Sequence, residues 1–287
     1  MRLSMAPDTS APVVNPTMLS GRTLRRELTV RILLPPSEGK RAPGTGRPVE
    51  PVRLLGPGLL EPRTEVMTAL ARLCSGNTDE ALRVLKLGAR LRDEVTGNAT
   101  VAEAPAAAAG SVYTGVLYEA LGLAELPSRI RDMAHERLVI FSGLWGVVRT
   151  DDRIPAYRCP IGVNLPELGG ERTTLAAFWR PWLAAELPRL FGSEFLLDLR
   201  SGAYAAMWQP TGAHATVRVV HERTVDGQVR RSVVSHFNKA TKGRITADLL
   251  RNDVRCGSAA ELAEALRDLK YRVERDGSRL DVVVTQV

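Results

Sequence analysis

The sequence contains few cysteines, and they stand far apart. Cys74, Cys159 and Cys256 form no CxxC pair and have no histidine beside them. This spacing argues against a zinc site and against a disulfide framework, and it is typical of proteins in a reducing compartment. We therefore expect a cytoplasmic protein with free cysteines. No motif implies a metal or another cofactor.

Long apolar segments are also absent. No stretch approaches the roughly 18 uninterrupted apolar residues that a membrane-spanning helix needs, so no membrane partner is expected. The first residues lack the apolar centre of a secretory signal. They are rich in Pro, Ser and Thr. This composition predicts a disordered N-terminal extension over residues 1–29 and a folded domain over residues 30–287.

Three common catalytic signatures are missing as well. The chain has no GxSxG, HExxH or GxGxxG motif. Hydrolases with a nucleophile elbow, zinc proteases and Rossmann dehydrogenases therefore have no motif support. Gly39 and Lys40 resemble the end of a phosphate-binding loop, but the earlier glycine and the following Ser or Thr are missing. A Walker A loop is therefore rejected.

What is present is typical of a globular protein. The chain has 287 residues, of which 44% are hydrophobic and 25% charged, enough to bury a full core. Helical and strand patterns alternate without a repeat. This predicts an α/β (mixed α+β) fold, a single compact domain with a central mixed sheet and flanking helices. A formal net charge of +7 and a pI near 9.7 favour anionic partners, either nucleic acid or phosphorylated small molecules.

Hydrophobic periodicity and turn residues locate the main elements. Strands are expected at Val30–Leu34, Leu138–Phe141, Phe195–Leu199 and Leu280–Gln286, and a hairpin around Asp226 and Gly227 is expected to join Thr216–His221 to Arg230–Ser235. Helices are expected at Glu61–Leu73, Thr78–Leu91, Leu175–Leu187 and Ser258–Leu269, and two short ones within Tyr113–Ala134 around a tight turn at Gly122. Pro181 should kink or restart the helix that contains it.

Four of the expected strands are followed by clusters of polar residues. The first cluster contains Ser37, Glu38 and Lys40. The second contains Ser142 and Trp145 and continues to Tyr157 and Arg158. The third contains Asp198, Arg200, Ser201 and Tyr204. The fourth contains His236, Asn238, Lys239, Thr241, Lys242 and Gly243. We expect it to follow a strand that ends at Ser235 and to precede a helix.

These clusters predict one shared basic cleft, because ligands of open α/β sheets bind beyond the carboxyl ends of the strands. Each cluster also has a purely structural interpretation. The first could be a capped turn, Trp145 could belong to the core, and Asp198 and Arg200 could form a salt bridge at the rim of the sheet. The residue types suit the binding of a phosphate or polyanion, and they would also suit acid–base chemistry.

At these clusters the chain resembles the family of the YaaA peroxide stress protein. The matching stretches are LLPPSEGK (33–40), YTGVLYEALGL (113–123), FSGLWGVVRTDDRIPAYR (141–158), LDLRSGAYAAMW (197–208) and VVSHFNKATKGR (233–244). The resemblance covers residues 30–287 and leaves the first 29 residues unmatched.

The resemblance implies a cytoplasmic, mixed α/β protein with a positively charged cleft and a helix-hairpin-helix-like element. It also implies a role in lowering free iron and limiting DNA damage under hydrogen peroxide, and binding to DNA. Tyr113–Ala134 is the best match for the hairpin element. Its turn departs from the usual glycine-rich hairpin because it has a single glycine, Gly122.

Three hypotheses about function follow. The first is a DNA-binding stress protein in which Lys239, Lys242, Arg244 and the hairpin element contact phosphates. The second is an enzyme, in specialised metabolism or elsewhere, that acts on a nucleotide-like or other anionic small molecule. The third, direct iron binding, has the least support because no His, Asp or Glu set shows ligand spacing.

The second hypothesis places its candidate catalytic residues around one pocket. Candidate catalytic residues are Ser37, Glu38, Lys40, Asp198, Arg200, His236 and Lys239. Candidate binding residues are Tyr113, Tyr118, Ser142, Trp145, Tyr157, Arg158, Ser201, Tyr204, Asn238, Lys242 and Arg244. No residue is proposed as a metal ligand.

Overall fold

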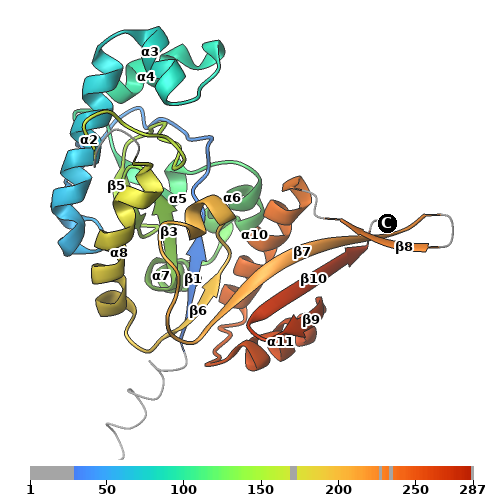
Figure 1. Ribbon diagram of the computed structural model, residues 1–287. Helices are drawn as coiled ribbons and strands as arrows, with labels where there is room; N and C mark the ends of the chain where they lie inside the picture. The colour runs from blue at the N-terminus through green and yellow to red at the C-terminus, as the bar shows by residue number, and fades with distance from the viewer. Residues whose placement is uncertain (1–28, 169–172, 226–227, 233–234, 286–287) are drawn as a thin grey trace, which may run out of the picture.

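The structure is a computed structural model that describes residues 29–168, 173–225, 228–232 and 235–285 (Figure 1). Residues 1–28 of the expected N-terminal extension lie outside this range, whereas Thr29 forms an antiparallel bridge with Arg255. Within the described ranges, no helix is long and apolar enough to cross a membrane.

The described strands form a mixed sheet of eight strands in the order β4-β3-β1-β6-β7-β10-β9, with β8 paired to β7. Their bounds are β1 Val30–Leu34, β3 Leu138–Ser142, β4 Gly146–Val148, β6 Phe195–Asp198, β7 His214–Val225, β8 Gln228–Ser232, β9 Arg272–Asp276 and β10 Arg279–Thr285. A separate two-stranded sheet pairs β2 (Ala107–Ala108) with β5 (Arg153–Ile154). The mixed α/β fold in one compact domain is thereby confirmed.

Five neighbouring strands of the large sheet are parallel. β1 runs parallel to β3 and to β6, and β7 runs parallel to β6 and to β10. β3 and β6 are buried along their whole length, as is β1 except for Arg31, which is typical of inner strands covered on both faces. Since Leu34 pairs with Ile140 and Leu33 with Asp198, the carboxyl ends of β3, β1 and β6 lie side by side.

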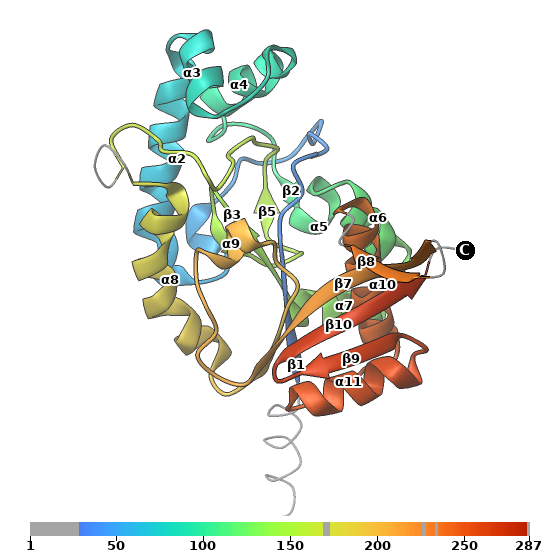
Figure 2. The same cartoon turned by 45° about the vertical axis from the view of Figure 1, so that its right-hand side comes forward.

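The helices cover both sides of this sheet. Their bounds are α2 Leu60–Ser75, α3 Thr78–Val84, α4 Arg92–Ala99, α5 Ala109–Val112, α6 Val116–Leu121, α7 Ser128–Arg137, α8 Leu175–Phe191, α9 Gly202–Ala205, α10 Ser235–Arg251 and α11 Ala259–Asp268. Four short 3-10 helices are η1 Pro51–Arg53, η2 Pro57–Leu59, η3 Ala89–Leu91 and η4 Leu123–Glu125. α2 and α8 lie on one side of the sheet, and α6, α7 and α10 lie on the other (Figures 1 and 2).

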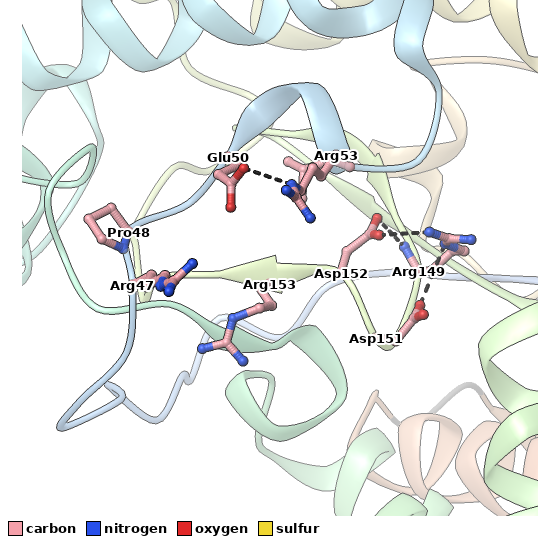
Figure 3. Close-up of a pocket in the computed structure, with 9 residues that line it drawn as sticks. Arg47, Pro48, Glu50, Arg53, Arg149, Asp151, Asp152 and Arg153 are labelled. Atoms are coloured by element: carbon pink, nitrogen blue, oxygen red, sulfur yellow. Dashed lines mark hydrogen bonds and ion pairs between the residues drawn. The ribbon is translucent and has the colours of Figure 1, made fainter.

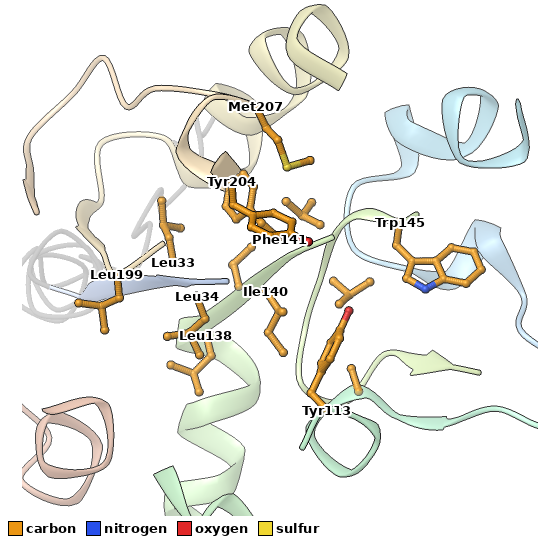
Figure 4. Close-up of a cluster of buried hydrophobic side chains, with 14 of the residues drawn as sticks. Leu33, Leu34, Tyr113, Leu138, Ile140, Phe141, Trp145, Leu199, Tyr204 and Met207 are labelled. Carbon is orange, nitrogen blue, oxygen red and sulfur yellow. The ribbon is translucent and has the colours of Figure 1, made fainter. Parts of the chain in front are cut away.

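The core beneath the carboxyl ends of the strands is apolar. Leu33, Leu34, Ile140 and Phe141 are completely buried, and Tyr204 lies above them on the segment that follows β6 (Figure 4). The loops that leave these strands are therefore anchored on a close-packed base.

The fourth polar cluster differs from expectation. It lies in the first turns of α10, which begins at Ser235, and not in a loop after a strand. Packing explains the difference, because α10 lies against α6 at Gly243. A Cβ there would meet the carbonyl oxygen of Leu117 at 2.2 Å, so the glycine marks a close contact between helices.

Other elements follow the sequence with local exceptions. The two short helices around Gly122 are present as α6 and α7, and β7 and β8 form the expected antiparallel pair, whose turn at Asp226 and Gly227 lies outside the described residues. α3 ends at Val84, well before the expected Leu91, and Lys86 adopts a positive φ of 55° two residues later. α8 continues through Pro181 to Phe191, so of the two expected effects of this proline, a kink or a restart, the restart does not occur.

Candidate functional site

A cleft of about 550 Å³ opens at the carboxyl ends of β1 and β6. Four segments that are distant in sequence form its walls: the loop after β1, the start of α6, the segment after β6 and the start of α10. The lining residues are Pro35, Pro36, Ser37, Glu38, Gly39, Gly115, Val116, Leu117, Tyr118, Leu199, Ser201, Tyr204, Asn238, Lys239 and Lys242. The first, third and fourth predicted clusters therefore meet here.

The loop after β1 presents Ser37 and Glu38 to the cleft and is held from behind. The Lys40 ammonium donates to the carbonyl oxygen of Ser37 at 2.8 Å. Arg158 donates to the carbonyl oxygen of Glu38 at 2.7 Å, and its Nε lies 3.3 Å from the Glu38 carboxylate. The Tyr118 hydroxyl donates to the carbonyl oxygen of Pro35 at 2.7 Å. The loop is thus fixed by its own Lys40 and by two side chains from other parts of the fold, Arg158 and Tyr118.

Lys40 lies beneath this loop and is not among the residues that line the cleft. Its ammonium lies 4.3 Å from the ring centre of Tyr157 and 5.5 Å from that of Tyr113, in the range of cation–π contacts. Burial lowers the pKa of Lys40 to about 8, with the Glu38 carboxylate opposing the shift.

Ser142 belongs to a buried chain of hydroxyl groups. The hydroxyls of Tyr113 and Tyr157 lie 2.8 Å apart, and the Tyr157 hydroxyl lies 2.7 Å from Ser142 Oγ. Ser142 Oγ also accepts backbone N–H groups from Trp145 and Leu144 at 2.9 and 3.2 Å. Burial raises the pKa of both tyrosines, so the chain is neutral and supports the loop that follows β3.

Trp145 is completely buried. The adjacent glycines accommodate the protein's own chain, since a Cβ at Gly143 would meet the carbonyl oxygen of Cys159 at 2.3 Å and one at Gly146 would meet the Trp179 ring at 2.8 Å. Their close approach therefore serves packing in this structure. Trp145 therefore belongs to the core, which was the structural interpretation of this residue in the sequence.

Asp198 and Arg200 form a buried, two-pronged ion pair. Arg200 Nε and Nη2 lie 2.9 and 2.6 Å from the two carboxylate oxygens of Asp198. Arg200 also donates to the carbonyl oxygen of Trp208 at 2.9 Å, and its guanidinium stacks 4.1 Å above the Phe141 ring centre. The Arg200 side chain is fully buried, and it fixes the segment after β6. This segment carries Ser201, which is exposed, and Tyr204, which is buried, and both line the cleft.

α10 supplies the cations of the cleft. Lys242 is 9% exposed, and its ammonium donates to the carbonyl oxygen of Leu199 at 3.0 Å. Burial lowers the pKa of Lys242, while Asp198 opposes the shift. Lys239 is exposed beside it. The Oδ1 atom of Asn238 is buried and has no hydrogen-bond partner within the described chain, so a ligand or water that donates a hydrogen bond is needed there.

Two predicted residues of α10 stand apart from this set. Arg244 is exposed and donates to Thr241 Oγ1 at 3.1 Å, and it does not line the cleft. The side chain of His236 lies outside the part of the chain that the structure describes.

Two residues that support the site, Asn98 and Gly115, and the buried Arg63 outside it were not predicted. The Asn98 side chain bonds the backbone N–H and carbonyl of Arg158 at 2.9 and 2.8 Å and so positions the arginine that holds Glu38. Arg63 is fully buried and donates to the carbonyl oxygens of Trp145, Gly56 and Val147. Gly115 has φ of +92°, and a Cβ there would lie 3.0 Å from Ser37 Oγ. Among these, only the glycine that opens α6 could have been noticed in the sequence.

The cleft can therefore bind an anion that also carries a hydrogen-bond donor. Ser37, Lys239 and Lys242 can donate to oxyanions, and Asn238 offers an acceptor. No group of three or more His, Cys, Asp or Glu side chains in the described residues could hold a metal ion. All three cysteines are free and buried.

Comparison with known proteins identifies relatives along most of the chain. The model of the family described as "Peroxide stress protein YaaA" matches residues 30–276. A UPF0246 protein of Streptomyces coelicolor is 49% identical over 267 residues, which cover 89% of this chain and 99% of that protein. A UPF0246 protein of Corynebacterium efficiens is 37% identical over 256 residues, again 89% of this chain and 99% of that protein.

Proposed function

Because this chain belongs to the family of the peroxide stress protein YaaA, we propose that it acts in the peroxide stress response of the cytoplasm. There it limits free iron and damage to DNA, and its cleft binds the phosphate groups of DNA or of another phosphate-bearing anion. The cytoplasmic site of action also accords with three free, buried cysteines.

The observation that carries this proposal is the meeting of donors from distant segments in one cleft. Ser37 comes from the loop after β1, whereas Lys239 and Lys242 come from α10. Phosphate oxygens are acceptors only, and hydrogen bonds from ammonium groups to them are stronger than neutral ones. Because Lys242 is already engaged with a carbonyl, Lys239 supplies the more available positive charge.

The hairpin element contributes less to phosphate binding in this proposal. The backbone N–H of Gly122 donates to the carbonyl oxygen of Tyr118 at 3.0 Å and closes the end of α6. It is therefore used within the protein. The surface around this turn carries the carboxylates of Glu119 and Glu125 as well as the cations Arg41 and Arg131, so its charge is mixed.

The test is a titration of duplex DNA with the Lys239→Ala variant at several salt concentrations. One lost phosphate contact should weaken binding and flatten the slope of log K against log salt by about 0.9. Lys270→Ala, at an exposed lysine just after α11, serves as the matched control and should keep the wild-type slope. An unchanged slope for Lys239→Ala, or strong affinity that barely varies with salt, contradicts the proposal.

A second candidate function is an enzyme that acts on a nucleotide-like or other anionic small molecule. The observation that favours it is Glu38, whose side chain is 53% exposed and lies in the cleft wall. A carboxylate repels phosphate and is therefore unfavourable in a site that only binds DNA. Beside a lysine whose pKa burial lowers to about 8, it suits proton transfer.

A further inference from the structure

A second hollow of about 540 Å³ lies at the edge of the sheet formed by β4 (Figure 3). It is bounded by the loop before η1, by η1 itself and by the connection from β4 to β5. Its lining residues are Arg47, Pro48, Glu50, Arg53, Leu54, Arg149, Asp151, Asp152 and Arg153. It shares no lining residue with the cleft at β1 and β6.

The three carboxylates of this hollow are already engaged. Asp152 is 5% exposed, and one of its oxygens accepts the backbone N–H groups of Leu55 and Arg149 at 2.8 and 2.9 Å. Asp151 lies 3.5 Å from Nε of Arg149. Glu50 accepts a hydrogen bond from Arg53 at 2.7 Å.

Two of the four arginines have no carboxylate partner among the described residues. The Arg47 side chain makes no hydrogen bond or ion pair with the described residues, and the guanidinium of Arg153 donates only to the carbonyl oxygen of Ala106. Their backbones are nevertheless tied down. Arg47 accepts a backbone hydrogen bond from Ala106 at 3.1 Å, and Arg153 pairs with Ala108 between β5 and β2.

We propose that this hollow binds a phosphorylated small molecule of nucleotide size, with Arg47 and Arg153 as its phosphate ligands. A guanidinium offers a planar fork of donors that matches phosphate oxygens. The volume lies within the range of small-molecule sites. Glu50 and Asp151 flank the arginines and would repel an extended polyanion, so the hollow favours a compact ligand over DNA. The proposal is independent of the function assigned to the cleft.

The test uses the full chain with AMP as the probe and adenosine as its uncharged counterpart, measured by titration calorimetry. AMP should bind, and adenosine should bind at least tenfold more weakly. Arg47→Ala and Arg153→Ala should each weaken AMP binding by about tenfold or more, since each removes a charge-assisted contact. Arg83→Ala, at an exposed arginine of α3 that pairs with Glu80, should leave the affinity unchanged.

A second substitution that is expected to strengthen AMP binding shows whether weaker binding in the arginine variants is caused by misfolding. Glu50→Gln removes a flanking negative charge at an exposed position, and it should tighten AMP binding several-fold. Lys239→Ala in the cleft should leave this binding unchanged. The proposal is overturned if AMP does not bind at millimolar concentration, if Arg47→Ala and Glu50→Gln have no effect, or if Lys239→Ala alone abolishes binding.

Discussion

Lys40, a candidate catalytic residue, lies beneath the loop after β1 and does not line the cleft. The sequence does not reveal that the backbone carbonyls of Ser37 and Glu38 and the ring of Tyr157 surround this lysine in the folded chain. Once the loop turns over these rings, the ammonium gains a hydrogen bond at 2.8 Å and a cation–π contact at 4.3 Å. The direction of its side chain therefore depended on how its own loop turns and on Tyr157, which is more than 100 positions away in the sequence.

The lowered pKa of Lys40 predicts a specific pH dependence of stability. Its pKa falls from 10.5 to about 8 on folding, so below pH 8 both the folded and the unfolded chain carry this proton and the cost of burying the charge is fully present. Between pH 8 and 10.5 the unfolded chain binds the proton and the folded chain does not. Folding then becomes more favourable at this site as the pH rises.

Lys40→Met removes this titration. The free energy of unfolding of the wild type should therefore increase relative to that of Lys40→Met as the pH rises from about 8 towards 10.5, measured by urea unfolding at each pH. Lys270→Met, at an exposed lysine, should follow the wild type. A difference between wild type and Lys40→Met that stays constant over this range contradicts the expected shift.

Arg63 marks the limit of prediction at a single residue. It lies in a helix that the sequence located well, yet nothing in the sequence distinguishes it from the exposed Arg72 of the same helix. Its role comes from the carbonyl groups of loops that converge only in the folded chain. Burial lowers its pKa to about 10, and its hydrogen bonds keep the guanidinium buried among these loops.

Among the elements, the inner strands were the most predictable. β1 and β3 were located within one residue, because parallel strands covered on both faces are continuous apolar runs. β9 was missed, since its sequence RVERD contains one buried residue. The start of α10 was predicted as a loop because its residues are polar. Packing on α6 through Gly243 makes this segment helical, a contact that no local pattern reveals.

The contact between α10 and α6 predicts that Gly243→Ala destabilises the protein. In a helix, Ala is favoured over Gly by roughly 1 kcal/mol. At this position the added Cβ would meet Leu117 O at 2.2 Å and the Ala120 side chain at 2.9 Å, and such overpacking costs about 1–3 kcal/mol. Urea unfolding should therefore show a net loss of stability, and the variant should also bind cleft ligands more weakly because Lys239 and Lys242 move with α10.

Gly97→Ala provides the matched control for this change. Gly97 lies in α4, and a Cβ there meets nothing within 4 Å. The same substitution should therefore stabilise the protein by roughly 0.5–1 kcal/mol. Equal effects of the two variants would show that helix propensity, and not packing, decides the outcome at Gly243.

At the scale of the whole molecule, the location of the cleft was predictable because it follows from topology. Three parallel strands, β3, β1 and β6, place the segments after them at one edge of the sheet, as expected for open α/β sheets. Which side chains reach the cleft was not predictable. Ser142, Asp198 and Arg200 satisfy one another or the backbone inside the fold, whereas Ser37 and Glu38 face outward.

The same topology places Glu38 in the wall of the cleft, so the effect of substituting it distinguishes a DNA-binding protein from an enzyme. Glu38→Gln keeps a hydrogen-bond acceptor near Arg158, and this partly exposed ion pair should contribute little to stability. If the cleft only binds DNA, losing the negative charge should leave DNA affinity unchanged or slightly raised, and protection should persist. If the cleft performs acid–base chemistry, protection should be lost although folding and DNA affinity remain.

We expect the second outcome, because a carboxylate near a lysine whose pKa burial lowers to about 8 is suited to proton transfer. The measurement is survival under hydrogen peroxide in a host that lacks its own family member and expresses either variant. Glu94→Gln is the matched control, since Glu94 also lies near Arg158, at 3.8 Å, but does not line the cleft. A folded Glu38→Gln variant that protects as well as Glu94→Gln would rule out an enzyme that depends on this carboxylate.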